Sequence, residues 1–289
     1  MGRRAETLNP AWTDRQHLNV WAGFGGVSTV FMLFAACAPA SSGGPRAQSV
    51  ERQSETEYDL ARDVFYKGQP RAALDHAKKA VELDPENAKA LYFTSVIYSW
   101  FCNEEPQLKA PDCSIDLAEQ YARKAIHADD NFRDAKNLLA QILLWRERYS
   151  DVIALLEPLT KDPAYGASHL AWGNLGWAQI HSGKLDAGII SLRNSTSQPK
   201  FCVGHYRLGV AYTKKRDFAA AEESFSAAVS VDSPDCKSLQ VAWEERGYTR
   251  VRLGKVDGAK EDFAHCKQIA PETKSGRACS VELAKLGTP

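Results

Sequence analysis

This chain has no excess of charge of either sign. Its 36 lysine and arginine residues balance 36 aspartate and glutamate residues, so its formal net charge at pH 7 is zero. A neutral chain has no long-range field that would recruit nucleic acid, and no stripe of basic residues interleaved with aromatic residues stands out. The composition therefore argues against nucleic-acid binding.

The common catalytic and metal-binding motifs are also absent. The sequence contains no His-Glu-x-x-His, no phosphate-binding Gly-x-x-x-x-Gly-Lys and no Gly-x-Ser-x-Gly. It has no Cys-x-x-Cys pair, and its seven histidines are scattered, so a zinc site would lack clustered ligands. We therefore expect no enzyme activity, no cofactor or metal, and no small-molecule substrate.

A long hydrophobic run is missing as well. The stretch from Val20 to Ala36 is uncharged, but it contains several glycines and is short for a membrane-spanning helix. Because the basic residues Arg3 and Arg4 precede it, the stretch is typical of a signal peptide, which we assign to residues 1–36.

The end of this stretch has the pattern of a bacterial lipobox. Ala35 and Ala36 stand directly before Cys37, the residue that would be diacylated and become the new N-terminus, although Phe34 stands where leucine is usual. The alternatives are an ordinary secretory signal cleaved nearby or a loose membrane anchor. Each buried methylene of the acyl chains contributes about 0.8 kcal/mol, so lipidation would anchor the chain firmly. Ala38, rather than aspartate, follows the cysteine; we therefore expect the periplasmic face of the outer membrane.

The remainder of the chain contains a helical repeat. Small residues recur with gaps of 45, 34, 36, 33 and 38, at Ala73, Ala118, Val152, Gly188, Ala221 and Ala259. A period of about 34 residues is typical of the tetratricopeptide repeat, a pair of antiparallel helices that stacks into a superhelix. We expect an all-α, right-handed superhelix of six such repeats over residues 54–271. A flexible tether at 37–53 would precede it, and a capping helix and tail at 272–289 would follow.

Six cysteines remain besides Cys37, and in an exported chain an even number favours disulfides. Two of them lie at the ends of an enlarged turn in the second repeat, and two others lie one repeat apart. We favour pairing between neighbours, although six cysteines allow many connectivities. The alternative is free, buried cysteines that pack as small apolar residues. The favoured pairs are Cys102 with Cys113, Cys202 with Cys236, and Cys266 with Cys279.

The first helices of the repeats would line a concave groove that binds proteins. The positions that we expect to point inward are rich in aromatic side chains and poor in charge, a composition typical of protein-binding surfaces. The alternative is that several of these rings pack between repeats. The groove residues are Tyr58, Phe65, Tyr66, Tyr92, Trp100, Asn137, Gln141, Trp145, Trp177, His181, Tyr206 and Tyr248.

Three features together resemble the PilF/PilW/Tgl family of pilotins, and the Tgl branch most of all. They are the segment Phe201-Cys202-Val203-Gly204, the run Trp172-Gly173-Asn174-Leu175-Gly176-Trp177-Ala178, and the cysteine-bracketed turn of the second repeat. The resemblance implies a lipoprotein that holds secretin protomers at the outer membrane. It further implies that the protein promotes their insertion and multimerisation in type IV pilus biogenesis. Two other readings stay open: a lipoprotein of the β-barrel assembly machinery, and a general periplasmic interaction scaffold.

Overall fold

The computed structural model describes residues 45–104 and 112–287, and these residues contain 14 helices and no strand. The chain forms two compact units, residues 1–135 (unit 1) and residues 136–289 (unit 2). The helices are α1 (Pro45–Tyr66), α2 (Pro70–Leu83), α3 (Ala88–Glu104), α4 (Ile115–Ala128), α5 (Arg133–Trp145), α6 (Tyr149–Leu159), α7 (Ser168–His181), α8 (Leu185–Ser195), α9 (Cys202–Lys215), α10 (Phe218–Ser230), α11 (Pro234–Lys237), α12 (Gln240–Arg252), α13 (Val256–Ile269) and α14 (Lys274–Gly287).

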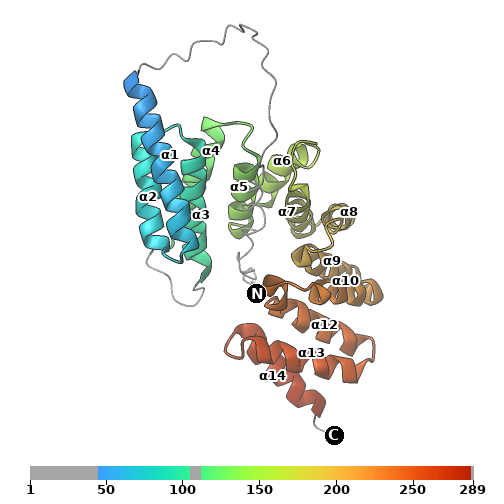
Figure 1. The fold of residues 1–289 in the computed structure, drawn as a ribbon. Coiled ribbons are helices and arrows are strands. Elements are labelled where there is room, and N and C mark those ends of the chain that lie inside the picture. The colour runs from blue at the N-terminus through green and yellow to red at the C-terminus, as the bar shows by residue number, and fades with distance from the viewer. Residues whose placement is uncertain (1–44, 105–111, 288–289) are drawn as a thin grey trace, which may run out of the picture. The chain divides into compact units, whose positions relative to one another are not determined.

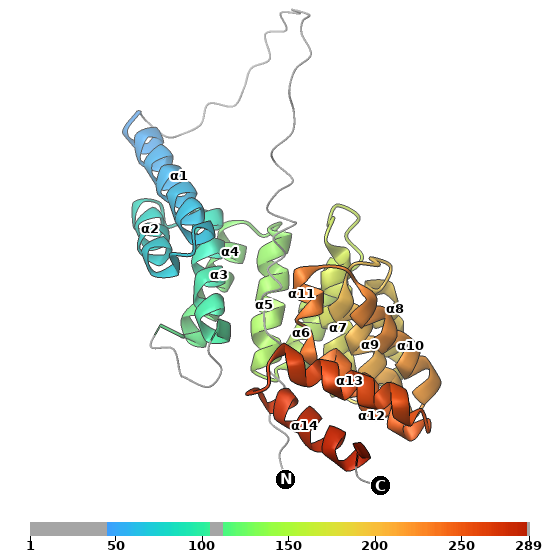
Figure 2. The ribbon, with the colours of Figure 1, turned by 60° about the horizontal axis from the view of Figure 1, so that its bottom comes forward.

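The helices follow one another as the pairs of a tetratricopeptide solenoid. In unit 1, α1 packs on α2 and α3 on α4; in unit 2, α7 packs on α8, α9 on α10 and α12 on α13 (Figure 1). Residues 146–148 separate α5 from α6. The last helix, α14, packs on α13 and also contacts α12, as a capping helix does (Figure 2). Five packed helix pairs, the consecutive helices α5 and α6, and a C-terminal cap confirm the predicted fold class.

Small residues let the paired helices approach closely. A Cβ atom placed on Gly176 of α7 would lie 2.6 Å from Cγ of Leu192 and 2.9 Å from the carbonyl oxygen of Gly188 in α8. One on Gly188 would lie 2.3 Å from Cγ2 of Ile180. These distances are too short for any side chain, so the two glycines set the spacing of this pair. The recurrence of small residues in the sequence therefore marks helix contacts.

The turn between paired helices contains one residue in the left-handed conformation. Glycine occupies this position in three pairs, with φ values of 77°, 80° and 74° at Gly68, Gly183 and Gly254. Glu147 holds the equivalent place between α5 and α6, and Arg216 between α9 and α10, with φ of 56° and 65°; residues 105–111, between α3 and α4, lie outside the described residues. Glycine adopts this conformation without strain, whereas other residues disfavour it. The turn geometry thus belongs to the repeat and is imposed even where glycine is missing.

The expected tether is partly wrong, because α1 begins at Pro45 rather than after residue 53. Proline is well tolerated in the first turn of a helix, where its missing N–H has no intrahelical partner. Helix α1 also has a fixed contact at its middle: Ser54 is fully buried and its Oγ donates to the carbonyl oxygen of Ala80 at 2.8 Å. Residues 1–44, including Cys37, lie outside the described residues. Within the described residues, no helix is both long enough and apolar enough to cross a bilayer.

Three disulfides join the six cysteines, and they are the neighbour pairs that the sequence favours: Cys102–Cys113, Cys202–Cys236 and Cys266–Cys279. The first closes the loop between α3 and α4, the second joins α9 to the short α11, and the third joins α13 to α14. Each therefore ties together elements that the solenoid places next to each other. Bridges of this kind stabilise mainly by restricting the unfolded chain.

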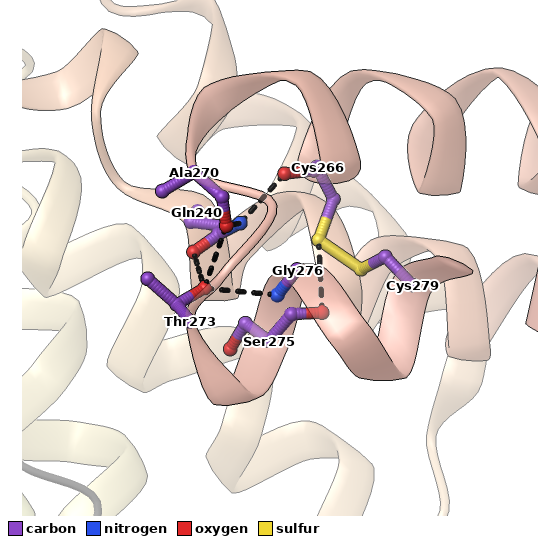
Figure 3. Close-up of a disulfide and its surroundings, with 7 residues drawn as sticks. All are labelled: Gln240, Cys266, Ala270, Thr273, Ser275, Gly276 and Cys279. Carbon is purple, nitrogen blue, oxygen red and sulfur yellow. Dashed lines mark hydrogen bonds between the residues drawn. A yellow bond between two sulfur atoms is a disulfide. The ribbon is translucent and has the colours of Figure 1, made fainter. Parts of the chain in front are cut away.

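A hydrogen-bond network surrounds the last disulfide and attaches the cap (Figure 3). Nε2 of Gln240 donates to the carbonyl oxygens of Cys266 and Ala270 at 2.6 and 2.9 Å. It thereby supplies a hydrogen-bond donor to carbonyl groups at the C-terminal end of α13. Oγ1 of Thr273 donates to Oε1 of Gln240 at 2.6 Å and accepts from the backbone N–H of Gly276 at 2.9 Å. The network joins α12, α13 and α14 at one point, because Gln240 of α12 bonds the end of α13 directly and the first turn of α14 through Thr273.

Candidate protein-binding surface

Unit 1 carries an aromatic cluster on its first helices, α1 and α3. Phe65 makes edge-to-face contacts with Phe93 and Trp100, at ring-centroid distances of 5.6 and 5.8 Å, and Tyr58 contacts Phe93 at 6.0 Å. Phe93 is buried, whereas Tyr58, Phe65 and Trp100 are partly exposed. The expected groove residues Tyr58, Phe65 and Trp100 therefore pack between the two repeats and also leave part of their rings accessible.

Two further residues of unit 1 differ in how accessible they are. Tyr66, at the end of α1, is 48% exposed and touches Phe65 edge-on. Tyr92 stacks obliquely on Phe132 at 5.0 Å, and burial raises the pKa of its phenol. Of the two, Tyr66 is the side chain that a partner could reach without rearrangement.

In unit 2 the accessible aromatic surface centres on Trp177 of α7. Its ring lies 4.6 Å from that of His181, which in turn stacks on Tyr149 of α6 at 5.2 Å. Trp177 is partly exposed and His181 is exposed. Tyr149 was not among the expected residues, because it lies on a second helix; α6 nevertheless begins beside the end of α7.

The prediction for Tyr206 is wrong. Its side chain is fully buried, with Trp177 at 6.5 Å and Phe225 of α10 at 6.0 Å, so the ring belongs to the core of unit 2. The prediction assigned inward-pointing positions by their spacing along each first helix and assumed the same surroundings in every repeat. The equivalent position one repeat earlier is Gly173, which has no side chain for comparison, and only the contact with Phe225 of α10 shows that the Tyr206 ring is buried.

The other expected residues of unit 2 lie at intermediate depth. Asn137, Gln141 and Trp145 on α5 are all partly exposed. Tyr248 on α12 packs edge-on against Phe263 at 5.2 Å, and burial together with Glu244 and Glu282 raises its pKa to about 12. Within unit 2, then, the expected groove residues divide into accessible ones, around Trp177, and packed ones, such as Tyr206.

A polar chain that sequence reasoning missed runs beside Trp177. Nδ2 of Asn174 donates to Oδ1 of Asn137 at 3.1 Å, and Nη1 of Arg207 donates to Oδ1 of Asn174 at 2.8 Å. The guanidinium carbon of Arg207 lies 5.4 Å from the centroid of the Trp177 ring, in cation–π range. The chain joins α5, α7 and α9. Its signal in the sequence is a polar residue two positions before a repeat glycine, as Asn174 is to Gly176 and Arg207 is to Gly209.

A second buried polar group, in the last two repeats, has a different composition. Asp262 of α13 is 1% exposed and accepts from Arg246 and Arg250 of α12, at 2.7 and 3.0 Å. Arg250 also binds Glu222 of α10 at 3.0 Å, and Lys255 binds the same carboxylate at 2.5 Å. Every charge in this group faces an opposite charge, so the group serves to hold the repeats together.

The described residues show no arrangement suited to a metal. No group of three or more His, Cys, Asp or Glu side chains that could hold an ion lies within residues 45–104 or 112–287. The described residues offer partly exposed aromatic rings, with the amides of Asn137 and Asn174 and the guanidinium of Arg207 packed beside Trp177, and such groups recognise polypeptide.

Comparison with known proteins agrees with this fold. Two segments, residues 58–98 and residues 204–235, match models of the tetratricopeptide repeat. This is a tetratricopeptide-repeat fold. No curated protein matches the sequence.

Several solved structures resemble the chain along most of its length. The crystal structure of PilW, a widely conserved type IV pilus biogenesis factor, is 20% identical, covers 78% of this chain and 97% of PilW, and has a TM-score of 0.63. PilF of Pseudomonas aeruginosa is 16% identical over 81% of this chain and 99% of PilF, with a TM-score of 0.62. The Cut9–Hcn1 complex of the APC/C is also similar, at 11% identity and a TM-score of 0.66 over 84% of this chain and 46% of that one. At these identities the likeness defines the fold.

Proposed function

We propose that this protein is a lipid-anchored pilotin of the Tgl type, which binds protomers of a type IV pilus secretin. In this role it promotes their insertion and multimerisation in the outer membrane. The observation that carries the proposal is that the likeness to PilW and PilF covers 97% and 99% of those chains. The Cut9 match, by contrast, covers less than half of that chain.

The proposed anchor would keep the repeats close to the membrane. If Cys37 is acylated, only residues 38–44 separate it from α1, and a segment of that length spans at most about 25 Å. The binding surface would then be confined to a thin layer, which raises its effective concentration toward secretin protomers held at the same membrane. Three disulfides are consistent with an oxidising compartment such as the periplasm.

Each unit carries a proposed binding surface of its own, which comprises the accessible aromatic residues of its first helices. Tyr66 in unit 1 and the Trp177–His181 pair in unit 2 offer rings that are anchored by neighbours but still reachable. Such rings lose little conformational entropy on binding and bury large areas, which is why aromatic residues dominate interface energetics. An unassembled secretin protomer would present apolar edges that ring closure later covers, and these rings could mask them.

Deletion of the gene tests the function. Heat-resistant, high-molecular-weight multimers of the resident secretin should disappear from an immunoblot while the monomer remains. A Cys37→Ser variant should give the same loss if acylation is needed. Unchanged multimers would contradict the proposal; simultaneous loss of many porins would point to the β-barrel assembly machinery instead.

Substitutions on the surface test where the secretin binds. Trp177→Ala and Tyr66→Glu should each lower secretin capture by the purified protein at least tenfold. Ile190→Glu is the matched control, because Ile190 is 62% exposed on a second helix, α8, away from the proposed surface. Equal binding by all three variants would exclude this surface.

A further inference from the structure

Arg207 is a buried cation without an anion. Its side chain is 8% exposed, its Nη1 donates to Oδ1 of Asn174, and its guanidinium lies against the Trp177 ring. Its Nε is buried and has no hydrogen-bond partner. No ion pair joins Arg207 to a carboxylate within the described residues, although arginine is rarely buried unless it is paired.

The electrostatic surroundings agree with the contacts. Burial lowers the pKa of Arg207 to about 10, and the one neighbouring titratable group that opposes this shift is Tyr206. Arg246, one repeat further on, faces the buried carboxylate of Asp262 at 2.7 Å. Within unit 2, Arg246 therefore has a counter-charge among the described residues, whereas Arg207 has none.

The groups around Arg207 suit a carboxylate. A guanidinium offers parallel N–H groups that match the two oxygens of a carboxylate, and Asn137 and Asn174 supply amide groups beside it. Trp177 forms an apolar wall that excludes water, which strengthens a charge-assisted hydrogen bond. A single positive charge matches a single carboxylate better than a doubly charged phosphate.

We propose that Arg207, together with Asn174, receives an acidic side chain of the protein partner, beside the Trp177 ring. An aspartate or glutamate side chain is favoured over a chain terminus because Arg207 exposes only a small part of its surface. A slender side chain can deliver its carboxylate there without bringing the backbone close. This inference rests on the proposed function for the identity of the partner, a secretin protomer, but its chemistry is tested independently of the secretin.

The first test uses small probes with the full-length protein. The Nε–H resonance of Arg207 is followed by NMR during titration with N-acetyl-glutamate amide, whose only carboxylate is on the side chain. A saturable shift is expected, with a Kd on the order of 1–10 mM for so small a probe. N-acetyl-glutamine amide should cause no shift. An equal or larger shift with N-acetyl-alanine, which carries a terminal carboxylate, would overturn the choice of a side chain, and no shift with any probe would overturn the site.

Two variants of different kinds keep the test decisive. We also expect the glutamate probe to change tryptophan fluorescence, because the Trp177 ring lies beside Arg207. Arg207→Met removes the charge and should abolish this change. Asn174→Asp keeps the shape of the side chain but places a fixed carboxylate at the position that Arg207 now contacts, so it should weaken probe binding at least tenfold. Arg252→Met is the matched control, because Arg252 is exposed and lies over the Phe218 ring at 5.6 Å. Unaltered probe binding in the folded Asn174→Asp variant would contradict the proposal.

A final arm separates this inference from the proposed function. In cells, Arg207→Met should lower secretin multimers several-fold without lowering the amount of the protein itself. Multimers that vanish on gene deletion but stay normal with Arg207→Met would overturn the acidic-side-chain site and leave the pilotin function standing. Multimers that survive deletion would overturn the pilotin function, and the probe titration would then decide the carboxylate site alone.

Discussion

Two largely buried arginine side chains in unit 2, Arg207 and Arg246, differ in the groups that surround their guanidinium. Arg246, in the last repeat, faces Asp262, and its neighbour Arg250 bridges Asp262 and Glu222. Arg207, one repeat earlier, contacts an asparagine oxygen and a tryptophan ring, and no carboxylate of residues 45–104 or 112–287 pairs with it. Burying an ion costs several kcal/mol that only a counter-charge offsets. The paired site serves the fold, whereas the unpaired site is stabilised fully only by something that binds.

The largest expected loss of stability comes from removing the carboxylate of Asp262. Asp262→Asn would leave the mostly buried Arg246 beside a neutral group, while Arg250 would keep only Glu222, so we expect the free energy of unfolding to fall by roughly 3–5 kcal/mol. Equilibrium denaturation measures this loss. Asp232→Asn is the control: the Lys237–Asp232 pair is exposed, and its removal should leave stability unchanged. A small loss at Asp262 would mean that the buried group does not hold the last repeats.

The last repeat is also held covalently, which predicts the second largest effect. Replacing Cys266 and Cys279 together by serine should lower the free energy of unfolding by about 2–4 kcal/mol, because the bridge restricts the unfolded chain. Hydrogen exchange resolves where the loss occurs. Amides of α14 should lose protection while those of α7 keep theirs, since the bridge joins α13 to α14. Equal loss in both helices would show that unit 2 opens only as a whole.

Supplying Arg207 with a carboxylate should make the two sites alike. In Asn174→Asp the new carboxylate replaces the amide oxygen that accepts from Arg207 at 2.8 Å. We expect the free energy of unfolding to rise by about 1–2 kcal/mol, because hydrogen bonds between charged groups are stronger than neutral ones. Asn194→Asp is the control, since Asn194 is exposed in the last turn of α8, where a negative charge is slightly unfavourable. Destabilisation by Asn174→Asp would mean that Arg207 needs no anion.

The fold could be predicted because small residues recur in the sequence at the positions where paired helices touch. Ala73, Gly188 and Ala221 are buried where paired helices touch, and only small residues fit there. Neighbouring cysteines could be paired for the same reason, since a solenoid brings together elements that are near in sequence. The start of α1 could not be predicted, because Pro45 and the residues after it suit both a tether and a first helical turn.

The candidate surface was predicted less well, because burial of a groove residue depends on the next helix. Tyr206 occupies an inward position, but Trp177 and Phe225 cover it. The sequence did not predict that Arg207 is buried, since a charged residue on a first helix is usually solvated. Only the packing of α7 against α9 reveals that it is buried and lacks a counter-charge.

The smallest expected effect is the contribution of Glu222 to the free energy of unfolding, which depends on pH. Burial raises the pKa of Glu222, but hydrogen bonds from Lys255 and Arg250 outweigh this and lower it below 4.5. Glu222→Gln should therefore cost about 1 kcal/mol near neutral pH, a modest value because Lys255 is largely exposed. A carboxyl group with a lowered pKa stabilises the fold fully above its unfolded-state pKa, and loses this contribution as the pH falls through the folded-state value.

The measurement is the difference in free energy of unfolding between wild type and each variant as the pH falls. For Glu222→Gln the difference should be constant above pH 4.5 and shrink toward zero below it. For Arg207→Met it should stay flat between about pH 3 and pH 7, because no carboxylate in the described part of the chain pairs with Arg207 and the guanidinium keeps its proton throughout this range. An acid-dependent difference for Arg207→Met would show that a carboxylate of the protein already serves Arg207, and the contrast between the two arginine sites would then disappear.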